Sequence, residues 1–132
     1  MSQHTPPPGR VTASPNHLPR GRAKLVALEV SAQLASEIHH LSIPQGLSHL
    51  KDHLVRAADN TVLRLSEASG RTRGNRGQHL EAAYAENQEV QSDLLLLAGR
   101  GVPVGSSIQA LADRVGGLVY GLLRAEGRDR AQ

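Results

Sequence analysis

The sequence predicts an all-α protein: an up-down-up-down antiparallel four-helix bundle with a disordered N-terminal tail. Apolar residues recur at three- and four-residue steps over four long segments, which is the spacing of helices that pack lengthwise on one another. The connections between these segments are only a few residues long, and short connections favour antiparallel neighbours. No segment shows the alternating apolar and polar pattern of a half-buried strand.

The clearest helical pattern lies between Asn75 and Gly101. Its seam positions are Leu80, Ala83, Asn87, Val90, Leu94 and Leu97. After the connection Gly99–Pro103, the next segment repeats the spacing at Val104, Ile108, Leu111, Val115, Leu118 and Leu122. Asn87 is the polar member of the first seam. It either fixes helix register or oligomeric state, as a buried polar residue often does, or lies at the edge of the bundle in contact with water.

The first helix is expected from about Arg22 to Leu41. Its apolar side consists of Leu25, Leu28, Ala32, Ala35 and Ile38. Residues 1–21 hold five of the seven prolines and little apolar material, a composition typical of disordered segments. The expected organisation is therefore a basic tail over 1–21, the bundle over 22–126 and a frayed C-terminus over 127–132.

The expected helix boundaries follow from capping patterns. Ser42 with Pro44 and Gln45 predicts the start of the second helix, and Gly70 predicts its end. The inward positions of this helix are Leu47, Leu50, Leu54, Ala57, Ala58, Val62 and Leu65. Two further pairs predict the starts of the third and fourth helices: Asn75 with Gln78, and Ser106 with Gln109.

Composition narrows the possible classes of protein. Of the 132 residues, 39% are hydrophobic, and the chain has two Tyr, no Phe and no Trp, so its core is aliphatic. A small core of this kind is marginal alone, and self-association is a common remedy. The absence of cysteine excludes disulfides, thiolate metal sites and cysteine nucleophiles. No apolar run has the length of a membrane span, and the first residues lack a signal core, so a cytoplasmic protein is expected.

The net charge of +3 is distributed unevenly. Residues 1–24 carry Arg10, Arg20, Arg22 and Lys24 without an acidic residue, and residues 71–80 carry Arg71, Arg73 and Arg76 without one. The rest of the chain is mildly acidic. Contact with a polyanion is therefore expected to begin in the tail and in the connection between the second and third helices.

From Pro44 onward, the chain carries the residues of a bacterial family pattern. The matching residues are Pro44, Leu50, Leu54, Arg56-Ala57-Ala58, Glu67, Leu80, Ala83, Glu89, the leucines at 94–97 and Ala98. Over about residues 25–125 the chain resembles the four-helix-bundle family that includes the intervening-sequence protein of ribosomal RNA genes. The same family includes the accessory variability determinant of diversity-generating retroelements. Arg64 stands where the family has Asn, Ala68 where it has Gly, and Ala85-Glu86 where it has Gly-Ser. The resemblance implies a homopentamer without enzymatic activity, binding nucleic acid and a reverse transcriptase in the retroelement branch.

The candidate nucleic-acid-binding residues are five arginines: Arg56, Arg64, Arg71, Arg73 and Arg76. The first two belong to a polar stripe on the second helix formed by His49, His53, Arg56, Asn60, Arg64 and Glu67. Guanidinium groups suit phosphates and carboxylates alike, and the connection over 71–77 suits a phosphate backbone. The alternatives are a solvated helix face, with Arg56 paired to Asp52, Asp59 or Asn60, and a merely solubilising turn. Base stacking is not expected, because neither Tyr84 nor Tyr120 lies among these arginines in sequence.

No catalytic site, metal site or cofactor is predicted. His49 and His53 have the spacing of a helical metal-ligand pair, but Leu50 replaces the Glu of a zincin helix, and no Glu-x-x-His occurs. Glu86 and Glu89 are the nearest acidic candidates on another helix. Gly117 and Gly121 are interpreted as places where a neighbouring helix approaches closely.

The sequence thus favours a non-enzymatic, homo-oligomeric bundle, pentameric by resemblance, that binds RNA or DNA and, by resemblance, a reverse transcriptase. The alternative is a protein–protein interaction scaffold that does not bind nucleic acid.

Overall fold

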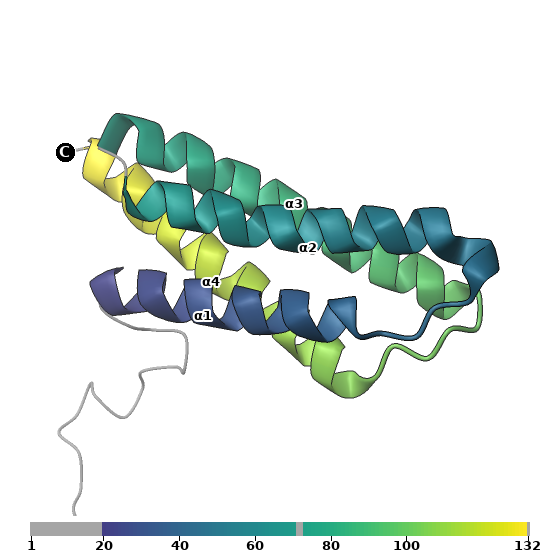
Figure 1. The fold of residues 1–132 in the computed structure, drawn as a ribbon. Helices are drawn as coiled ribbons and strands as arrows, with labels where there is room; N and C mark the ends of the chain where they lie inside the picture. Colours follow the sequence, from purple (N-terminus) through teal and green to yellow (C-terminus); the bar gives the residue numbers. More distant parts are fainter. Residues whose placement is uncertain (1–19, 71–72, 132) are drawn as a thin grey trace, which may run out of the picture.

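The computed structural model describes residues 20–70 and 73–131, which form four long helices joined by short connections (Figure 1). The helices are α1 (Arg20–His39), α2 (Ser48–Ser69), α3 (Arg73–Gly99) and α4 (Ser106–Ala131), and a 3-10 turn, η1, spans Gln45–Leu47. Successive helices run in opposite directions, and α1 also packs on α4, which closes the bundle. The predicted up-down-up-down four-helix bundle is confirmed. Most of the predicted tail lies outside the described residues, and Arg20 and Gly21 already belong to α1.

The core is aliphatic, as expected, and follows the predicted seams of the last three helices most closely. The buried residues of α2 are Leu50, Leu54, Ala57, Ala58, Thr61, Leu65 and Ala68. Those of α3 include Leu80, Ala83, Asn87, Val90, Leu94 and Leu97, and those of α4 include Ile108, Ala112, Val115, Leu118, Val119 and Leu122. Burial of apolar area of this kind is the main favourable term in folding.

The predicted inward face of α1 is wrong apart from Ile38. The residues of α1 that are buried in the core are Ala23, Ala27, Val30, Leu34 and Ile38. Leu25 is 50% exposed, Ala32 is exposed, and Leu28 and Ala35 are only partly buried. α1 has apolar residues on two sides, and the sequence pattern favoured the leucine-rich side. In the structure that side lies at the margin of the core, with Leu28 and Ala35 partly buried against it and Leu25 exposed.

The connection between α3 and α4 depends on two glycines. Gly101 has a φ of +81° and Gly105 a φ of +90°, a region that residues with a Cβ rarely adopt. The Val102 amide donates to the carbonyl of Leu97 at 3.0 Å, and the Gly101 amide donates to that of Ala98 at 3.0 Å. This is a Schellman motif, which satisfies the last carbonyls of a helix. Val102 is buried and anchors the turn to the core.

Two predicted helix starts are wrong. α2 begins at Ser48, after Pro44 and the turn η1, and its start has no side-chain cap hydrogen bond. The pattern of Ser42, Pro44 and Gln45 therefore lies before α2 and does not cap it, because the chain first forms the 3-10 turn η1. α3 begins at Arg73, so Asn75 is not a cap, and most of the expected basic turn over 71–77 is helical.

α4 differs from expectation slightly at its start and more clearly at its end. It begins at Ser106, so the residue predicted as its cap is instead its first helical residue. It continues to Ala131, although a frayed end over 127–132 is predicted. Within the described residues, no helix combines the length and the apolarity that crossing a membrane requires.

Candidate nucleic-acid interface

The polar stripe of α2 does not simply face solvent, because three of its members meet side chains of α3. His53 contacts Asp93 and Glu89, Asn60 donates to Glu86 at 3.5 Å, and the Glu67 carboxylate lies 3.4 Å from His79 Nδ1. The two antiparallel helices keep one register over this distance: each step of seven residues along α2 is matched by a step of seven back along α3. The stripe is therefore partly a structural seam between α2 and α3.

His53 is the most strongly engaged residue of this seam. Its Nδ1 lies 2.6 Å from a carboxylate oxygen of buried Asp93, and its Nε2 lies 3.3 Å from Glu89. The hydrogen bond with Asp93 and the charge of that carboxylate raise the pKa of His53 above its ordinary value. Glu89 adds to this increase in pKa, while burial and the charge of Arg56 oppose it.

These contacts bear on His49 and His53, which have the spacing of a helical metal-ligand pair in the sequence. Both ring nitrogens of His53 face carboxylates, and His49 is exposed one turn earlier. Glu86 and Glu89 meet different partners on α2, Asn60 and His53. The described part of the chain contains no group of three or more His, Cys, Asp or Glu side chains placed to hold one metal ion.

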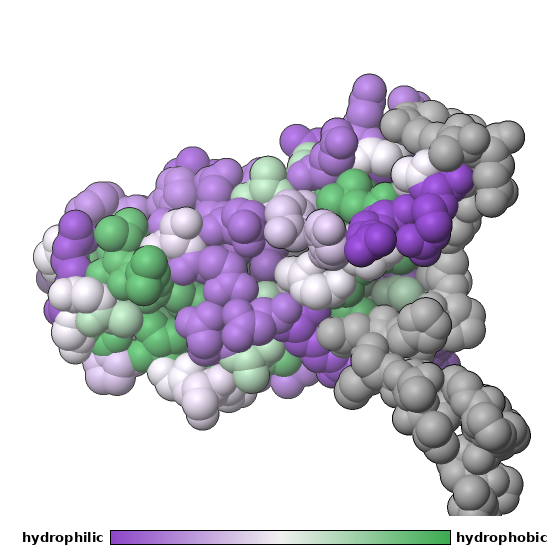
Figure 2. Space-filling view, turned by 180° about the vertical axis from the view of Figure 1, so that it is seen from behind, coloured by the Kyte–Doolittle hydropathy of each residue, from purple (hydrophilic) through white to green (hydrophobic). Residues whose placement is uncertain are grey.

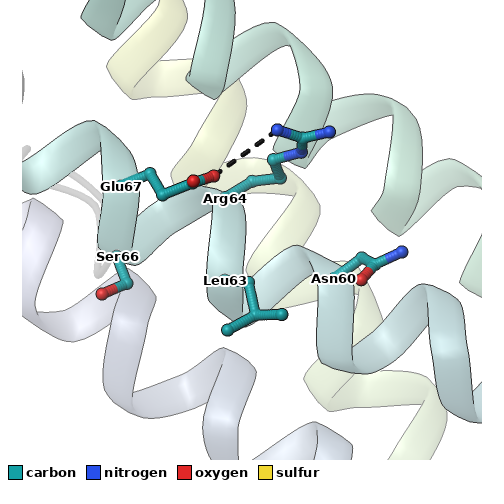
Figure 3. A pocket seen from close by; sticks show the side chains of 5 residues that line it. All are labelled: Asn60, Leu63, Arg64, Ser66 and Glu67. Atoms are coloured by element: carbon teal, nitrogen blue, oxygen red, sulfur yellow. Dashed lines mark hydrogen bonds and ion pairs between the residues drawn. The ribbon is translucent and has the colours of Figure 1, made fainter.

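Arg64 lies on the outer face of α2, where it pairs with Glu67 of the same helix at 3.4 Å. Figure 3 shows the two side chains reaching toward each other above Leu63 and Ser66. These residues and Asn60 line a depression of about 360 Å³. An exposed pair at this distance contributes little stability, so Arg64 remains available to an external anion.

Arg56 is exposed on the same face of α2, one helical turn before Asn60. Among the described residues it forms no ion pair, so the expected pairing with Asp52 or Asp59 is not formed. It lines a second depression, of about 520 Å³, between the end of α1 and the outer side of α2. The lining is mixed in charge and partly apolar: His39, Lys51, Asp52, Val55, Arg56, Asp59, Asn60 and Leu63.

Arg76 has a different environment from the other candidate arginines. Its Nε lies 3.4 Å from Oε1 of Glu126, which is buried at the end of α4, and the Arg76 side chain itself is only 20% exposed. Among the described residues, Oε2 of Glu126 and Nε of Arg76 lack hydrogen-bond partners. Arg76 therefore neutralises a buried carboxylate and joins α3 to α4. Of the remaining candidates, Arg73 is the first residue of α3, and Arg71 lies outside the described residues.

The topology gathers basic segments that are far apart in sequence. In Figure 1 the start of α1, the end of α2, the start of α3 and the end of α4 all lie at the same end of the bundle. We call this the basic end and define it as residues 20–27, 64–70, 73–81 and 120–131. Its basic residues are Arg20, Arg22, Lys24, Arg64, Arg73, Arg76, Arg124, Arg128 and Arg130. Its acidic residues are Glu67, Glu81, Glu126 and Asp129.

The opposite end of the bundle has the opposite charge. Residues 36–53 and 86–114 carry three basic residues, Lys51, Arg100 and Arg114. They carry six acidic residues, Glu37, Asp52, Glu86, Glu89, Asp93 and Asp113. Figure 2 shows in addition a hydrophobic area at this end, on the left of the view. The bundle is therefore electrically asymmetric along its axis, and a polyanion is attracted to one end.

The basic residues of α4 are the part of the site that sequence reasoning missed. Arg124 and Arg128 are exposed and lie far in sequence from the arginines of the second connection. The antiparallel topology was itself predicted, and it already requires the end of the fourth helix to lie beside the start of the third.

Comparison with protein-family models, with curated proteins and with solved structures gives no match for this chain.

Proposed function

We propose that this protein is a non-enzymatic accessory protein that self-associates and binds nucleic acid through its basic end. The observation that supports the proposal is the basic excess of the four helix ends that meet there, against an acidic excess at the other end. Lysine and arginine side chains that neutralise phosphates release condensed counterions, which gives affinity with little dependence on base sequence. The proposed contacts are exposed Arg22, Arg124 and Arg128, together with Arg64 and the predicted Arg71 and Arg73.

Two of the arginines predicted from the sequence to bind nucleic acid, Arg76 and Arg56, are not among the main phosphate contacts in this proposal. The role of Arg76 is mainly structural, because its guanidinium neutralises buried Glu126. Arg56 lies more than two turns before the end of α2, where Asp52 and Asp59 line the same depression. It is therefore a weaker phosphate contact than the residues of the basic end.

Self-association is supported by the outer face of α1 and α2. Leu25 and Leu63 are 50% and 58% exposed, and the partly buried Leu28, Ala35 and Val55 add apolar surface on the same two helices. Apolar surface of this kind is typical of a face that is covered by another molecule. In the homopentamer that the family resemblance implies, the basic end is repeated around one axis, and repeated weak contacts bind with high avidity. By the same resemblance, a reverse transcriptase is the proposed protein partner.

A charge-matched pair of triple variants tests the proposal. Arg22→Gln/Lys24→Gln/Arg128→Gln removes one lysine and two arginines from the basic end, and Lys51→Gln/Arg100→Gln/Arg114→Gln removes the same set from the opposite end. Both variants have the same net charge. Affinity for random-sequence duplex DNA and RNA is measured by fluorescence anisotropy between about 50 and 200 mM salt.

The basic-end variant is expected to bind more weakly and to lose up to about one unit of salt slope per removed contact. The opposite-end variant is expected to bind as the wild type does. Equal effects of the two variants would show that net charge alone attracts nucleic acid and would contradict the proposed interface.

The protein-interaction scaffold is the second candidate function. It is favoured by the exposed leucines, since Leu95 and Leu96 at the end of α3 add to Leu25 and Leu63. If the wild-type protein binds neither DNA nor RNA at low salt, the scaffold is the better description.

A further inference from the structure

The fold brings the only two tyrosines of the chain together. Tyr84 of α3 and Tyr120 of α4 have ring centroids 6.1 Å apart with an angle of 46° between the ring planes, and the chain has no Phe and no Trp. Tyr84 is half-buried against the core, whereas Tyr120 is 51% exposed. The Tyr84 ring thus packs against the Tyr120 ring on the side of the core, and the Tyr120 ring remains accessible to solvent.

Glycines lie beside Tyr120 on the N-terminal side of its position in α4. Gly116 and Gly117 precede it by about one turn, and Gly121 follows it. A Cβ at Gly116 would meet Asn87, but a Cβ at Gly121 would meet nothing within 4 Å, and Gly117 is exposed. The predicted role of Gly117 and Gly121 in packing against another helix is therefore not found at Gly121. Because glycine lowers helix stability relative to alanine, the exposed glycines Gly117 and Gly121 lower the stability of α4. Beside Gly117, the Tyr120 side chain remains 51% exposed.

The same helix continues from Tyr120 into the basic end. The guanidinium carbon of Arg124 lies over the Tyr120 ring, 5.9 Å from its centroid, in an exposed cation–π contact. A base that stacked on this face would take the place of the guanidinium, which could then reach a phosphate. Arg128 follows one turn later. Residues four apart lie on one side of a helix, with a rise of about 6 Å per step. Tyr120, Arg124 and Arg128 therefore form a line in which an aromatic ring is followed by two cations.

We propose that Tyr120, supported by Tyr84, stacks on an unpaired nucleobase, and that Arg124 and Arg128 contact the phosphates that follow it. The site takes single-stranded nucleic acid, because the bases of a duplex are already stacked on each other. Its preference among bases is weak, since every base offers a π face. This inference rests on the proposed nucleic-acid binding and adds the form of nucleic acid that is bound. It differs from the expectation from sequence that no base stacks, which considered the candidate arginines of the second and third helices and not Arg124.

The intrinsic fluorescence of the chain makes the test direct, because tyrosine is its only strong fluorophore. The probes are an oligothymidylate, an abasic strand of the same length and charge, and a duplex. Oligothymidylate is expected to quench the tyrosine fluorescence and to bind about ten-fold more tightly than the abasic strand. Tyr120→Leu is expected to remove this ten-fold advantage and to leave the affinity for the duplex unchanged. Tyr120→Trp is expected to retain it, and helical circular dichroism checks that each variant is folded.

The outcomes separate this inference from the proposed function. Equal affinity for oligothymidylate and abasic strand overturns the stacking site, while duplex binding in the same experiment still supports the basic end. Failure of the wild-type protein to bind any of the three probes overturns both. If Tyr120→Leu changes the mass of the protein in solution but not its affinity for oligothymidylate, the ring is covered by a second copy of the chain, and the stacking site is wrong.

Discussion

Asn87 of α3 and Gly116 of α4 occupy adjoining space in the centre of the bundle. Asn87 is completely buried, and its Nδ2 donates to the carbonyl of Ala112 at 3.2 Å. A Cβ built on Gly116 would lie 3.2 Å from the same nitrogen. Within the part of the chain that the structure describes, the Asn87 Oδ1 has no hydrogen-bond partner. Of the two interpretations that the sequence left open, the structure supports the buried one, and Gly116 provides the room for the amide.

A double-mutant cycle measures how strongly Asn87 and Gly116 are coupled. We expect Asn87→Ala to destabilise by about 1–2 kcal/mol, because it removes a buried hydrogen bond and leaves a small cavity. Gly116→Ala is expected to lower stability or leave it unchanged, because crowding of Asn87 offsets the gain in helix propensity. In the double variant the new methyl group partly fills the cavity. The coupling free energy from urea unfolding is expected to be about 1 kcal/mol in favour of the double variant.

Gly121→Ala is the control for this cycle. The substitution places a methyl group where nothing lies within 4 Å, so only helix propensity changes. It is expected to stabilise the protein by about 0.5–1 kcal/mol. Additive effects of Asn87→Ala and Gly116→Ala would show that the two sites are independent, contrary to the contact between them.

The seams of α3 and α4 were predictable because their apolar residues recur at unbroken three- and four-residue steps along most of each helix. Positions such as Leu80, Val90 and Val115 recur at helical spacing and are all buried. In α1 the pattern offers two apolar sides, and the periodicity does not say which one meets α2 and α4. Only the packing of all four helices decides that Leu34 is buried and Leu25 is exposed.

The candidate site was predictable only in part, for a related reason. The arginines over 71–76 form a local cluster in sequence, but Arg124 and Arg128 join them through the antiparallel topology. The pairing of Arg76 with Glu126 spans fifty residues, so it has no local signal. The cluster of Tyr84, Tyr120 and Arg124 likewise depends on the register between α3 and α4, which sequence spacing alone does not fix.

The contact of His53 with Asp93 and Glu89 predicts a pH-dependent contribution to stability. The pKa of His53 is raised in the folded state, so the folded protein binds its proton more tightly than the unfolded chain does. The stabilisation is fully present below the unfolded pKa of about 6.5 and is lost as pH rises through the higher folded pKa. His53→Gln is therefore expected to destabilise most near pH 6 and progressively less above pH 7, as measured by urea unfolding over this range.

His49→Gln is the matched control for this pH effect. His49 is exposed on the same helix, one turn before His53, and forms no ion pair with a described residue. Its substitution is expected to leave the pH profile of stability unchanged. A loss of stability in His53→Gln that is constant across the pH range would indicate lost packing and would argue against the ion pair.

The buried pair of Arg76 and Glu126 predicts that Arg76 contributes mainly to stability. Arg76→Gln leaves the Glu126 carboxylate buried without a counter-charge, which is expected to destabilise by about 2–3 kcal/mol. Arg76→Leu/Glu126→Leu removes both charges and is expected to recover most of this loss. Thermal unfolding measures both variants. If the double variant is as unstable as Arg76→Gln, the cost lies in packing and the buried charge is not its cause.

Nucleic-acid affinity of the same variants distinguishes the two roles of Arg76. Because its guanidinium faces Glu126, the folded double variant is expected to bind DNA nearly as tightly as the wild type. A loss of salt slope by about one unit would instead show that Arg76 contacts a phosphate directly.

The outward leucines of α1 and α2 predict where copies of the chain meet. Leu63→Glu is expected to lower the mass in solution, measured by light scattering, because association would bury an unpaired carboxylate in place of an apolar side chain. Leu95→Glu is the control, since Leu95 is also exposed but lies near the end of α3, at the other end of the bundle. It is expected to leave the mass unchanged, at a value near five chains if the family resemblance holds.

The two substitutions also separate self-association from nucleic-acid binding. Leu63→Glu adds one negative charge near the basic end, but most of its effect on affinity is expected to come from the loss of avidity, since a single basic end binds more weakly than several joined ones. The affinity difference between wild type and Leu63→Glu should therefore shrink to the small effect of the added charge when both are compared as monomers at low protein concentration. If the wild-type protein is monomeric at every concentration, the proposed self-association is wrong. If Leu95→Glu dissociates and Leu63→Glu does not, the association surface lies elsewhere on the bundle. The exposed apolar residues of α1 would then be a candidate contact surface for a different protein partner.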